Sequence, residues 1–211
     1  HYDFDYYFVM DMTATEEEGQ TQSRSTFYLR KDGNAFGQRH KTSAVKGQEG
    51  EGEMIMIEDK KNHLNLMVLT AKKQVIVTAE NNEEENTEEE ADAPQADFDG
   101  ANLKKTGRTK KILGYTCHEY VYEDDSTRTT LWNAPDAGDI AEKLAAPGSS
   151  VFSMQTHWAK HKEGMLMEIT SQEKATTEGF HAKMIEIETK KGERLDLDGY
   201  KFVNLTRFMN E

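Results

Sequence analysis

The feature that most constrains how this chain can fold is a pair of short runs separated by a turn. Residues 115–123 and 127–133 are rich in β-branched and aromatic side chains, a composition typical of strands. Between them lie Asp124, Asp125 and Ser126, three residues that favour turns. Alternate residues of a strand point to opposite faces, and both faces of the first run carry apolar or aromatic groups. We therefore predict a β-hairpin at the centre of a sheet that is covered on both faces.

The start of the chain alternates strictly. Every second residue from Tyr2 to Met12 is aromatic or a methionine. This period of two predicts one long strand over residues 2–12, with all of these side chains on one face. Burial of each is worth about 1.5 to 3 kcal/mol before the cost in chain entropy is subtracted. A polar loop over residues 15–21 and a strand over residues 23–30 are expected to follow.

The remainder of the chain supplies further short runs with strand composition, separated by turns that contain lysine or glycine. These runs are residues 35–40, 53–58, 63–69, 74–79, 165–172, 179–189, 193–197 and 200–206. Helical spacing of apolar residues predicts one or two short helices around residues 136–161. The pattern as a whole predicts a mainly β protein, built as a single strongly curved antiparallel sheet or half-barrel.

Length and charge limit the organisation and the partners. The 211 residues are enough to bury a sizeable core, and we interpret residues 1–211 as a single domain. The net charge is −13, but residues 80–99 hold ten Asp or Glu and no Lys or Arg, which leaves about −3 for the rest. We expect this acidic segment to be a disordered or mobile loop. No basic stripe interleaved with aromatic residues is present, so nucleic acid is not an expected partner.

The single cysteine excludes an internal disulfide, so stability must come from the core. No apolar run approaches the roughly 20 residues that cross a bilayer, and no transmembrane segment is predicted. The first residue is His1 rather than Met, which we interpret as a mature chain from which a signal peptide has been removed.

One motif carries a resemblance to a known family. Lys105-Thr-Gly-Arg-Thr-Lys-Lys-Ile-Leu-Gly-Tyr-Thr-Cys-His-Glu-Tyr120, followed by Leu131-Trp-Asn-Ala-Pro-Asp136, resembles the bacterial envelope family catalogued as domain of unknown function 4412. The resemblance continues weakly in residues 54–59 and in the β-rich ends. It implies a periplasmic or secreted protein and a fold similar to lipoprotein carriers of the LolA/LolB type, a curved antiparallel sheet around an apolar cavity. It transfers no catalytic residue, and the acidic segment is not part of the family pattern.

Candidates for chemistry are few. His157 and His161 have the spacing of a zinc pair on a helix, but no third ligand accompanies them, and solvated histidines are favoured over a metal site. Cys117 cannot use the adjacent His118 as its base, because neighbours in a strand point to opposite faces. Burial as a small apolar group is the favoured role for this thiol. We predict no catalytic residue, no metal and no cofactor, and therefore no enzyme.

Methionines recur at alternating positions, as in Met54 with Met56 and Met165 with Met167. Flexible thioethers either fill a core or line a pocket that accepts varied apolar shapes. Two functions are considered: a non-enzymatic binder of an apolar ligand, such as a lipid or lipoprotein acyl chain, inside the curved sheet, and alternatively a packed interaction module that recognises a protein partner at the cell envelope. The predicted lining of the ligand site is Tyr6, Phe8, Met54, Met56, Trp132, Trp158, Met165 and Met167.

Overall fold

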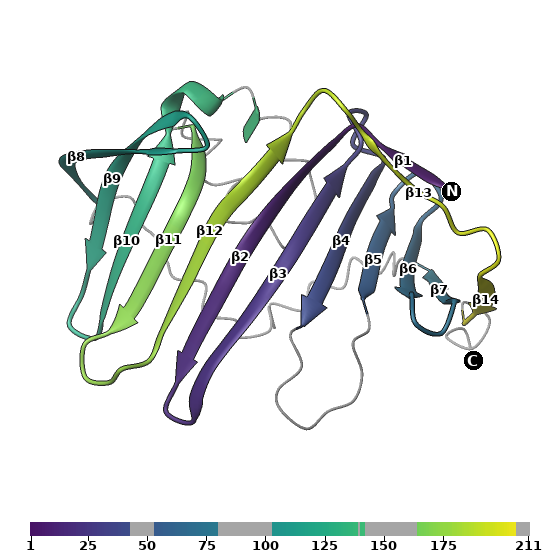
Figure 1. Ribbon diagram of the computed structural model, residues 1–211, viewed down its shortest axis with the longest axis horizontal. Helices are drawn as coiled ribbons and strands as arrows, with labels where there is room; N and C mark the ends of the chain where they lie inside the picture. Colours follow the sequence, from purple (N-terminus) through teal and green to yellow (C-terminus); the bar gives the residue numbers. More distant parts are fainter. Residues whose placement is uncertain (43–52, 80–102, 139, 142–163, 206–211) are drawn as a thin grey trace, which may run out of the picture.

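A single twelve-stranded sheet dominates the computed structural model of the protein (Figure 1). The structure describes residues 1–42, 53–79, 103–138, 140–141 and 164–205. In chain order the elements are β1 (Tyr2–Phe4), β2 (Tyr6–Glu16), β3 (Gly19–Leu29), β4 (Ala35–Thr42), β5 (Met54–Asp59), β6 (Leu64–Leu69), β7 (Gln74–Ala79), β8 (Lys104–Ile112), β9 (Tyr115–Glu123), β10 (Thr127–Ala134), the 3-10 helix η2 (Pro135–Ala137), β11 (Met165–Glu173), β12 (Gly179–Glu188), β13 (Glu193–Leu195) and β14 (Lys201–Asn204).

The strand order shows that the sheet consists of two meanders joined side by side. It runs β14-β7-β6-β5-β4-β3-β2-β12-β11-β10-β9-β8, so β2–β7 form one meander and β8–β12 the other. The meanders meet where β2 pairs with β12, and every pair is antiparallel except β14 with β7. Because β14 and β8 end the order, the sheet is not closed into a barrel. The prediction of a mainly β protein is confirmed. The expected single antiparallel sheet differs in two respects, because β14 pairs with β7 in parallel and β1 forms a separate pair with β13, and the strong curvature stays a prediction.

The alternating N-terminal run is two strands rather than one. The chain bends at Asp5, whose backbone N–H donates to the Leu29 carbonyl at 2.9 Å and whose carboxylate accepts from the Lys31 N–H at 2.8 Å. The bend sends Phe4 into one core cluster, while Phe8 belongs to another on the opposite face. The prediction of a single strand over residues 2–12 was wrong because periodicity does not register a local change of direction.

Other boundaries also differ from the predictions. The polar loop expected over residues 15–21 is a turn at Glu17 and Glu18, because β2 and β3 continue their pairing out to Glu16 and Gly19. β8, for which no strand was predicted, forms an edge of the sheet. In the region of the expected helices, the structure describes η2 and helical residues at 138, 140 and 141. Residues 142–163 and the acidic segment 80–99 lie outside the described residues.

One face of β5–β7, here called the strap face, lies beneath the two-stranded pair of β1 with β13 (Figure 1). Its alternating residues are buried against Phe4, Tyr28 and Leu197. Gly192 precedes β13 and passes so close to the Phe4 carbonyl that a Cβ atom would collide with it. The residues of β5–β7 in this cluster are Ile55, Ile57, Leu66, Val68, Val75 and Val77.

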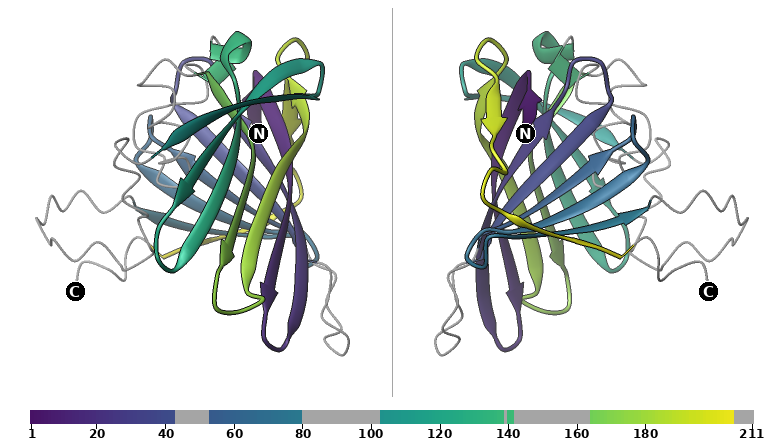
Figure 2. Two further views of the ribbon diagram at one scale, coloured as in Figure 1. Left: turned by 90° about the vertical axis from the view of Figure 1, so that its left-hand side faces the viewer. Right: turned by 90° about the vertical axis from the view of Figure 1, so that its right-hand side faces the viewer.

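The opposite face, here called the methionine face, holds a second cluster over β2, β3 and β4. Phe8 and Phe27 stack with ring centroids 4.8 Å apart, and Phe27 lies 6.4 Å from Phe36. Ala137 of η2 and the nearby Ala141 pack into this cluster. Figure 2, which views the sheet from its two ends, shows the strands fanning out between β8 and the β7–β14 edge.

Candidate functional site

A row of paired residues crosses eight strands of the sheet on the methionine face. Residues that pair directly across neighbouring strands share a face, so the register identifies the members of this row. All but one of them are apolar, and the exception is Gln38 on β4. From β12 to β14 the cross-sheet row is Ile187, Phe8, Phe27, Gln38, Met56, Met67, Ile76 and Val203.

The two halves of the cross-sheet row differ in their contact with solvent. Phe8 and Phe27 are buried in the core, whereas Met56 is 50% exposed and Met67 is 37% exposed. These two methionines are direct partners across β5 and β6. A contiguous apolar surface that water can reach is a common mark of a binding site. The exposed half of the row, over β5–β7, is therefore the candidate apolar site.

A second row lies beside the first on the same face. Met10 pairs with Ser25, Ser25 with His40, and His40 with Met54. The Ser25 hydroxyl is fully buried and lies 2.8 Å from His40 Nδ1. This places one polar pair among methionines, at the strands where the buried half of the sheet gives way to the exposed half.

The residues predicted to line a ligand site fall into three groups. Tyr6, Phe8, Met165 and Met167 are buried together in one core cluster, with Trp132 packed against it. Met54 and Met56 lie apart from them on β5. Trp158 lies outside the described residues. In the structure the residues of the first group pack against one another in the core. The role of all eight residues in lining a ligand site stays a prediction.

Sequence reasoning missed several residues of the exposed surface. Met67 was not recognised as the partner of Met56, and neither Gln38 nor the pair of Ser25 with His40 was singled out. The signal that identifies them is the register set by the turns: once β5 and β6 are known to turn around Lys60–His63, Met56 must face Met67. Register cannot be fixed from one-strand periodicity alone.

A hollow of about 670 Å³ lies on the strap face beside β1 and β14. Its floor contains Leu64, Leu66 and Val77, and Phe202, which is 54% exposed, forms part of its wall. The buried Asp59 accepts a hydrogen bond from the Tyr2 hydroxyl at 2.8 Å. Burial of the Tyr2 hydroxyl, together with this contact, raises the Tyr2 pKa. The hollow is thus apolar below and polar at its rim, on the face opposite Met56 and Met67.

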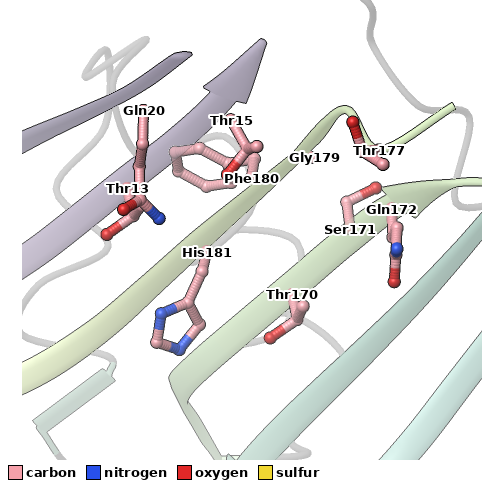
Figure 3. A pocket seen from close by; sticks show the side chains of 10 residues that line it. All are labelled: Thr13, Thr15, Gln20, Thr170, Ser171, Gln172, Thr177, Gly179, Phe180 and His181. Carbon is pink, nitrogen blue, oxygen red and sulfur yellow. The ribbon is translucent and has the colours of Figure 1, made fainter. Parts of the chain in front are cut away.

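A smaller hollow of about 280 Å³ lies near the β11–β12 turn and is lined mainly by hydroxyl and amide groups (Figure 3). Thr13 and Thr15 come from β2, Gln20 from β3, and Thr170 and Gln172 from β11. Of the predicted lining residues that the structure describes, none contributes to either this hollow or the one on the strap face. The character of this hollow is polar, unlike the apolar site that the sequence predicts.

The motif that carries the family resemblance surrounds a buried carboxylate. Glu119 is 2% exposed and accepts hydrogen bonds from Thr106 Oγ1 at 2.6 Å and from Arg108 Nε at 2.5 Å. Gly107 lies between these donors with a φ of 84°, at an irregularity in the β8–β9 register. The bulge turns both donors toward Glu119. These motif residues therefore stabilise the β8 edge.

Trp132 lies on β10, next to the motif residues of β9, and a charged side chain lies over its ring. Lys110 Nζ sits 4.1 Å from the Trp132 ring centroid and 2.8 Å from Glu168 Oε1. His181 Nε2 approaches the same carboxylate oxygen at 3.5 Å. The ring is thus partly covered by a cation–π contact, an arrangement that fixes a tryptophan without any ligand.

Nothing in the described parts of the chain forms a reactive centre of the kinds considered from the sequence. Cys117 is fully buried, and burial raises the pKa of its thiol, which disfavours the nucleophilic thiolate. Among the described residues, no group of three or more His, Cys, Asp or Glu could hold a metal ion. His157 and His161 lie outside them. No described helix is long and apolar enough to span a membrane.

The fold and the candidate site define a mainly β domain whose exposed apolar surface lies on one half of an open sheet. The chain belongs to a family described as Domain of unknown function (DUF4412), whose family model matches residues 8–199. This match confirms the resemblance inferred from the motif at residues 105–120. A search of curated proteins found no match.

Solved structures resemble the chain at low identity. A structure of PNGF-II is 13% identical with a TM-score of 0.38, and the match covers 95% of this chain but 31% of that one. The chain therefore spans about a third of that protein's length. A putative outer membrane lipoprotein-sorting protein domain from Vibrio parahaemolyticus is 10% identical, with a TM-score of 0.34 and coverage of 92% and 88%. A DUF1329 family protein from Desulfovibrio piger ATCC 29098 is 10% identical, with a TM-score of 0.32 and coverage of 88% and 85%.

Proposed function

We propose that the protein is a non-enzymatic binder of an apolar ligand, the acyl chain of a lipid or lipoprotein, which lies across β5, β6 and β7 on the methionine face. The observation that carries this proposal is the exposure of Met56 and Met67 as direct partners in an apolar row that continues into the core. Adjacent exposed thioethers offer a deformable apolar surface, which suits chains of varied shape.

The dimensions of the row agree with an acyl chain. From Gln38 on β4 to Val203 on β14 the row crosses four strand intervals of about 4.8 Å, a distance of about 19 Å. An extended long-chain acyl group covers such a distance. Each methylene group removed from water contributes about 0.8 kcal/mol, so a chain that is covered along part of this row gains several kcal/mol before the cost of immobilising it.

The proposal is tested by titrating the protein, purified without detergent, with a fluorescent long-chain fatty acid. The variant Met56→Lys/Met67→Lys places two charges on the exposed row, and we expect its affinity to fall about tenfold or more. Because both side chains are exposed, the variant should fold normally, which circular dichroism and a thermal melt verify. Absence of micromolar binding to the wild-type protein would reject the proposal.

A matched control lies on the other face. Phe202 is also apolar and exposed, but it belongs to the wall of the strap-face hollow. Phe202→Lys should leave the affinity for the fatty acid within about twofold of the wild-type value, because the substitution adds a charge on the face of the sheet opposite the cross-sheet row. Loss of binding in Phe202→Lys alone would instead assign the ligand to the strap-face hollow and refute the site on the methionine face.

A packed interaction module at the cell envelope is the second candidate. The observation that favours it is the exposed edge strand β8, since an edge offers unpaired backbone groups to a partner strand. However, Lys104, Lys105 and Lys111 are all exposed on β8, and edge lysines are a common device against strand addition. The acyl-binding proposal is therefore the better supported of the two.

An envelope location, periplasmic or secreted, forms part of this proposal. Its support is the resemblance of residues 105–120 to an envelope family, together with the choice of an acyl chain as ligand. Fractionation of the native cells with an antibody against the protein tests it. Recovery of the protein in the cytoplasmic fraction alone would contradict the location and weaken the case for a lipoprotein ligand.

A further inference from the structure

We infer that Ser25, His40 and Gln38 form a subsite for the carbonyl or carboxylate oxygen of an acyl ligand, because they are the polar groups of β3 and β4 that lie where the buried half of the methionine face meets its exposed half. This inference rests on the proposed function and adds to it the chemical class of the ligand's head. The shared chemistry is a hydrogen-bond acceptor attached to an apolar chain, as in a free fatty acid or an acyl ester.

The position of the polar groups on the sheet supports a head-group role. Gln38 lies in the cross-sheet row between Phe27 and Met56, and His40 follows two residues later on the same face of β4. β4 is the strand at which the row changes from buried phenylalanines to exposed methionines. A chain lying over β5–β7 would therefore end with its head at His40 and Gln38.

The hydrogen bond between Ser25 and His40 determines whether the second ring nitrogen of His40, Nε2, is a donor or an acceptor. Ser25 is fully buried, and its hydroxyl oxygen lies 2.8 Å from His40 Nδ1. The hydroxyl can donate to Nδ1 or accept from it; in the proposed subsite Ser25 is assigned as the donor, which places the ring proton of a neutral imidazole on Nε2. His40 thereby keeps an N–H donor, and its ring orientation is fixed by a buried partner.

The donor character of the subsite selects the ligand head. His40 Nε2–H and the Gln38 amide N–H groups are both donors, so they match an oxygen that accepts hydrogen bonds. A cationic head with no acceptor would leave these half-buried donors without a partner in the complex, which costs binding free energy. The geometry thus favours acyl carbonyls and carboxylates over chains with an ammonium head.

The test compares three ligands with the same twelve-carbon tail: dodecanoate, methyl dodecanoate and dodecyltrimethylammonium. Each displaces the fluorescent fatty acid from the wild-type protein and from three variants. In Ser25→Ala/His40→Leu both polar partners are removed together, so no buried group is orphaned. His40→Gln keeps a donor near the position of Nε2. Gln74→Leu is the matched control, because Gln74 lies in the same row as His40 but on β7.

The wild-type protein should prefer the two acyl ligands over the ammonium ligand about tenfold, the worth of one good hydrogen bond. Ser25→Ala/His40→Leu should lose that preference while still binding all three tails, whereas His40→Gln and Gln74→Leu should retain it. Comparing each variant's ratio with the wild-type ratio cancels the effect of the protein's net negative charge, which these substitutions leave unchanged while His40 is neutral. A change of ratio without loss of tail binding separates a head-group role from a purely structural one.

Two outcomes overturn the inference. If the acyl preference survives in Ser25→Ala/His40→Leu, the head lies elsewhere and the subsite is refuted, although the proposed acyl binding stands. If none of the three ligands binds the wild-type protein, the proposed function and the subsite fall together. Should the double variant unfold, Gln38→Leu replaces it, since Gln38 is half-buried and its loss should also reduce the acyl preference.

Discussion

Methionines alternate with other residues in two parts of the sheet, but they are buried in one part and exposed in the other. On β11, Met165 and Met167 alternate along a strand and are fully buried, whereas Met56 on β5 and Met67 on β6 stand in solvent. Alternation is the same in both places. The difference is what lies above the strand, because the cluster that holds Met165 also contains Ala137 and Ala141 from the segment after β10.

This contrast separates two roles that sequence cannot distinguish. A buried methionine contributes to stability through the contacts it makes, and its removal leaves a cavity. An exposed methionine contributes little to stability, so a pair of them held side by side across two strands fits the proposed binding role better than a role in folding. The following predictions test that division, beginning with the largest expected effect.

Met167→Ala should lower the free energy of unfolding by about 2 to 5 kcal/mol, because a fully buried side chain is replaced by a cavity. Met56→Ala is the matched control and should change it by no more than about 0.5 kcal/mol, since that side chain is half exposed. Urea unfolding followed by circular dichroism measures both. Equal losses of unfolding free energy in the two variants would show that the buried and the exposed methionines contribute alike to stability.

Ser25→Ala should lower the free energy of unfolding by about 1 kcal/mol, because it removes the hydrogen bond to His40 Nδ1. The effect lies between those of the two methionine variants, because His40 is only half-buried and water can replace the lost partner. The same urea titration measures it. A loss as large as that of Met167→Ala would show that this pair belongs to the core rather than to a ligand surface.

Asp124→Ala should lower the melting temperature by about 2 °C at neutral pH, because it removes the side-chain hydrogen bonds that hold the β9–β10 turn. The Asp124 carboxylate accepts N–H donors from Thr127 at 2.7 Å and Ser126 at 2.8 Å, and these contacts lower its pKa to about 2. A depressed pKa means that the stabilisation is present above about pH 4 and is lost as the pH falls toward 2. Thermal melts of both proteins across this range should therefore converge at the acid end.

Mild peroxide should oxidise Met56 and Met67 about ten times faster than Met165 and Met167, since sulfoxide formation requires access to the sulfur. Peptide mass spectrometry follows the reaction. The oxidised protein should keep its melting temperature within about 1 °C, because these thioethers support little of the fold. It should also bind the fluorescent fatty acid more weakly, since a sulfoxide is polar. Oxidation of both pairs at the same rate would contradict their different exposure.

Much of the sheet was predictable because most of its strands bury one face against a core and so alternate. The hairpin at residues 115–123 and 127–133 appears as β9 and β10 with nearly the expected bounds. β8 was missed because its exposed lysines and threonines do not alternate with apolar residues, so the sequence shows no strand periodicity there. The turn at Asp5 was missed because Phe4 and Tyr6 are both buried, although against different clusters.

The candidate site was predictable only in part. Met54 and Met56 were identified by their alternation, but their exposure depends on which segments cover each half of the sheet. The pairing of Ser25 with His40 depends on the register between β3 and β4, which joins residues that no short window of sequence relates. Local patterns fix which way a side chain points, while its partner is set by long-range pairing.

The junction of β2 with β12 has a kinetic consequence. It is the one place in the twelve-strand order where the two meanders meet, and it joins Tyr7 to Glu188 and Thr15 to Gly179. Contacts between such distant parts of a chain form slowly, because a large loop must close before they add any stability. Until then β2 and β12 remain unprotected edges that other copies can pair with. Recovery from denaturant is therefore expected to be slow, with a yield that rises as the protein is diluted.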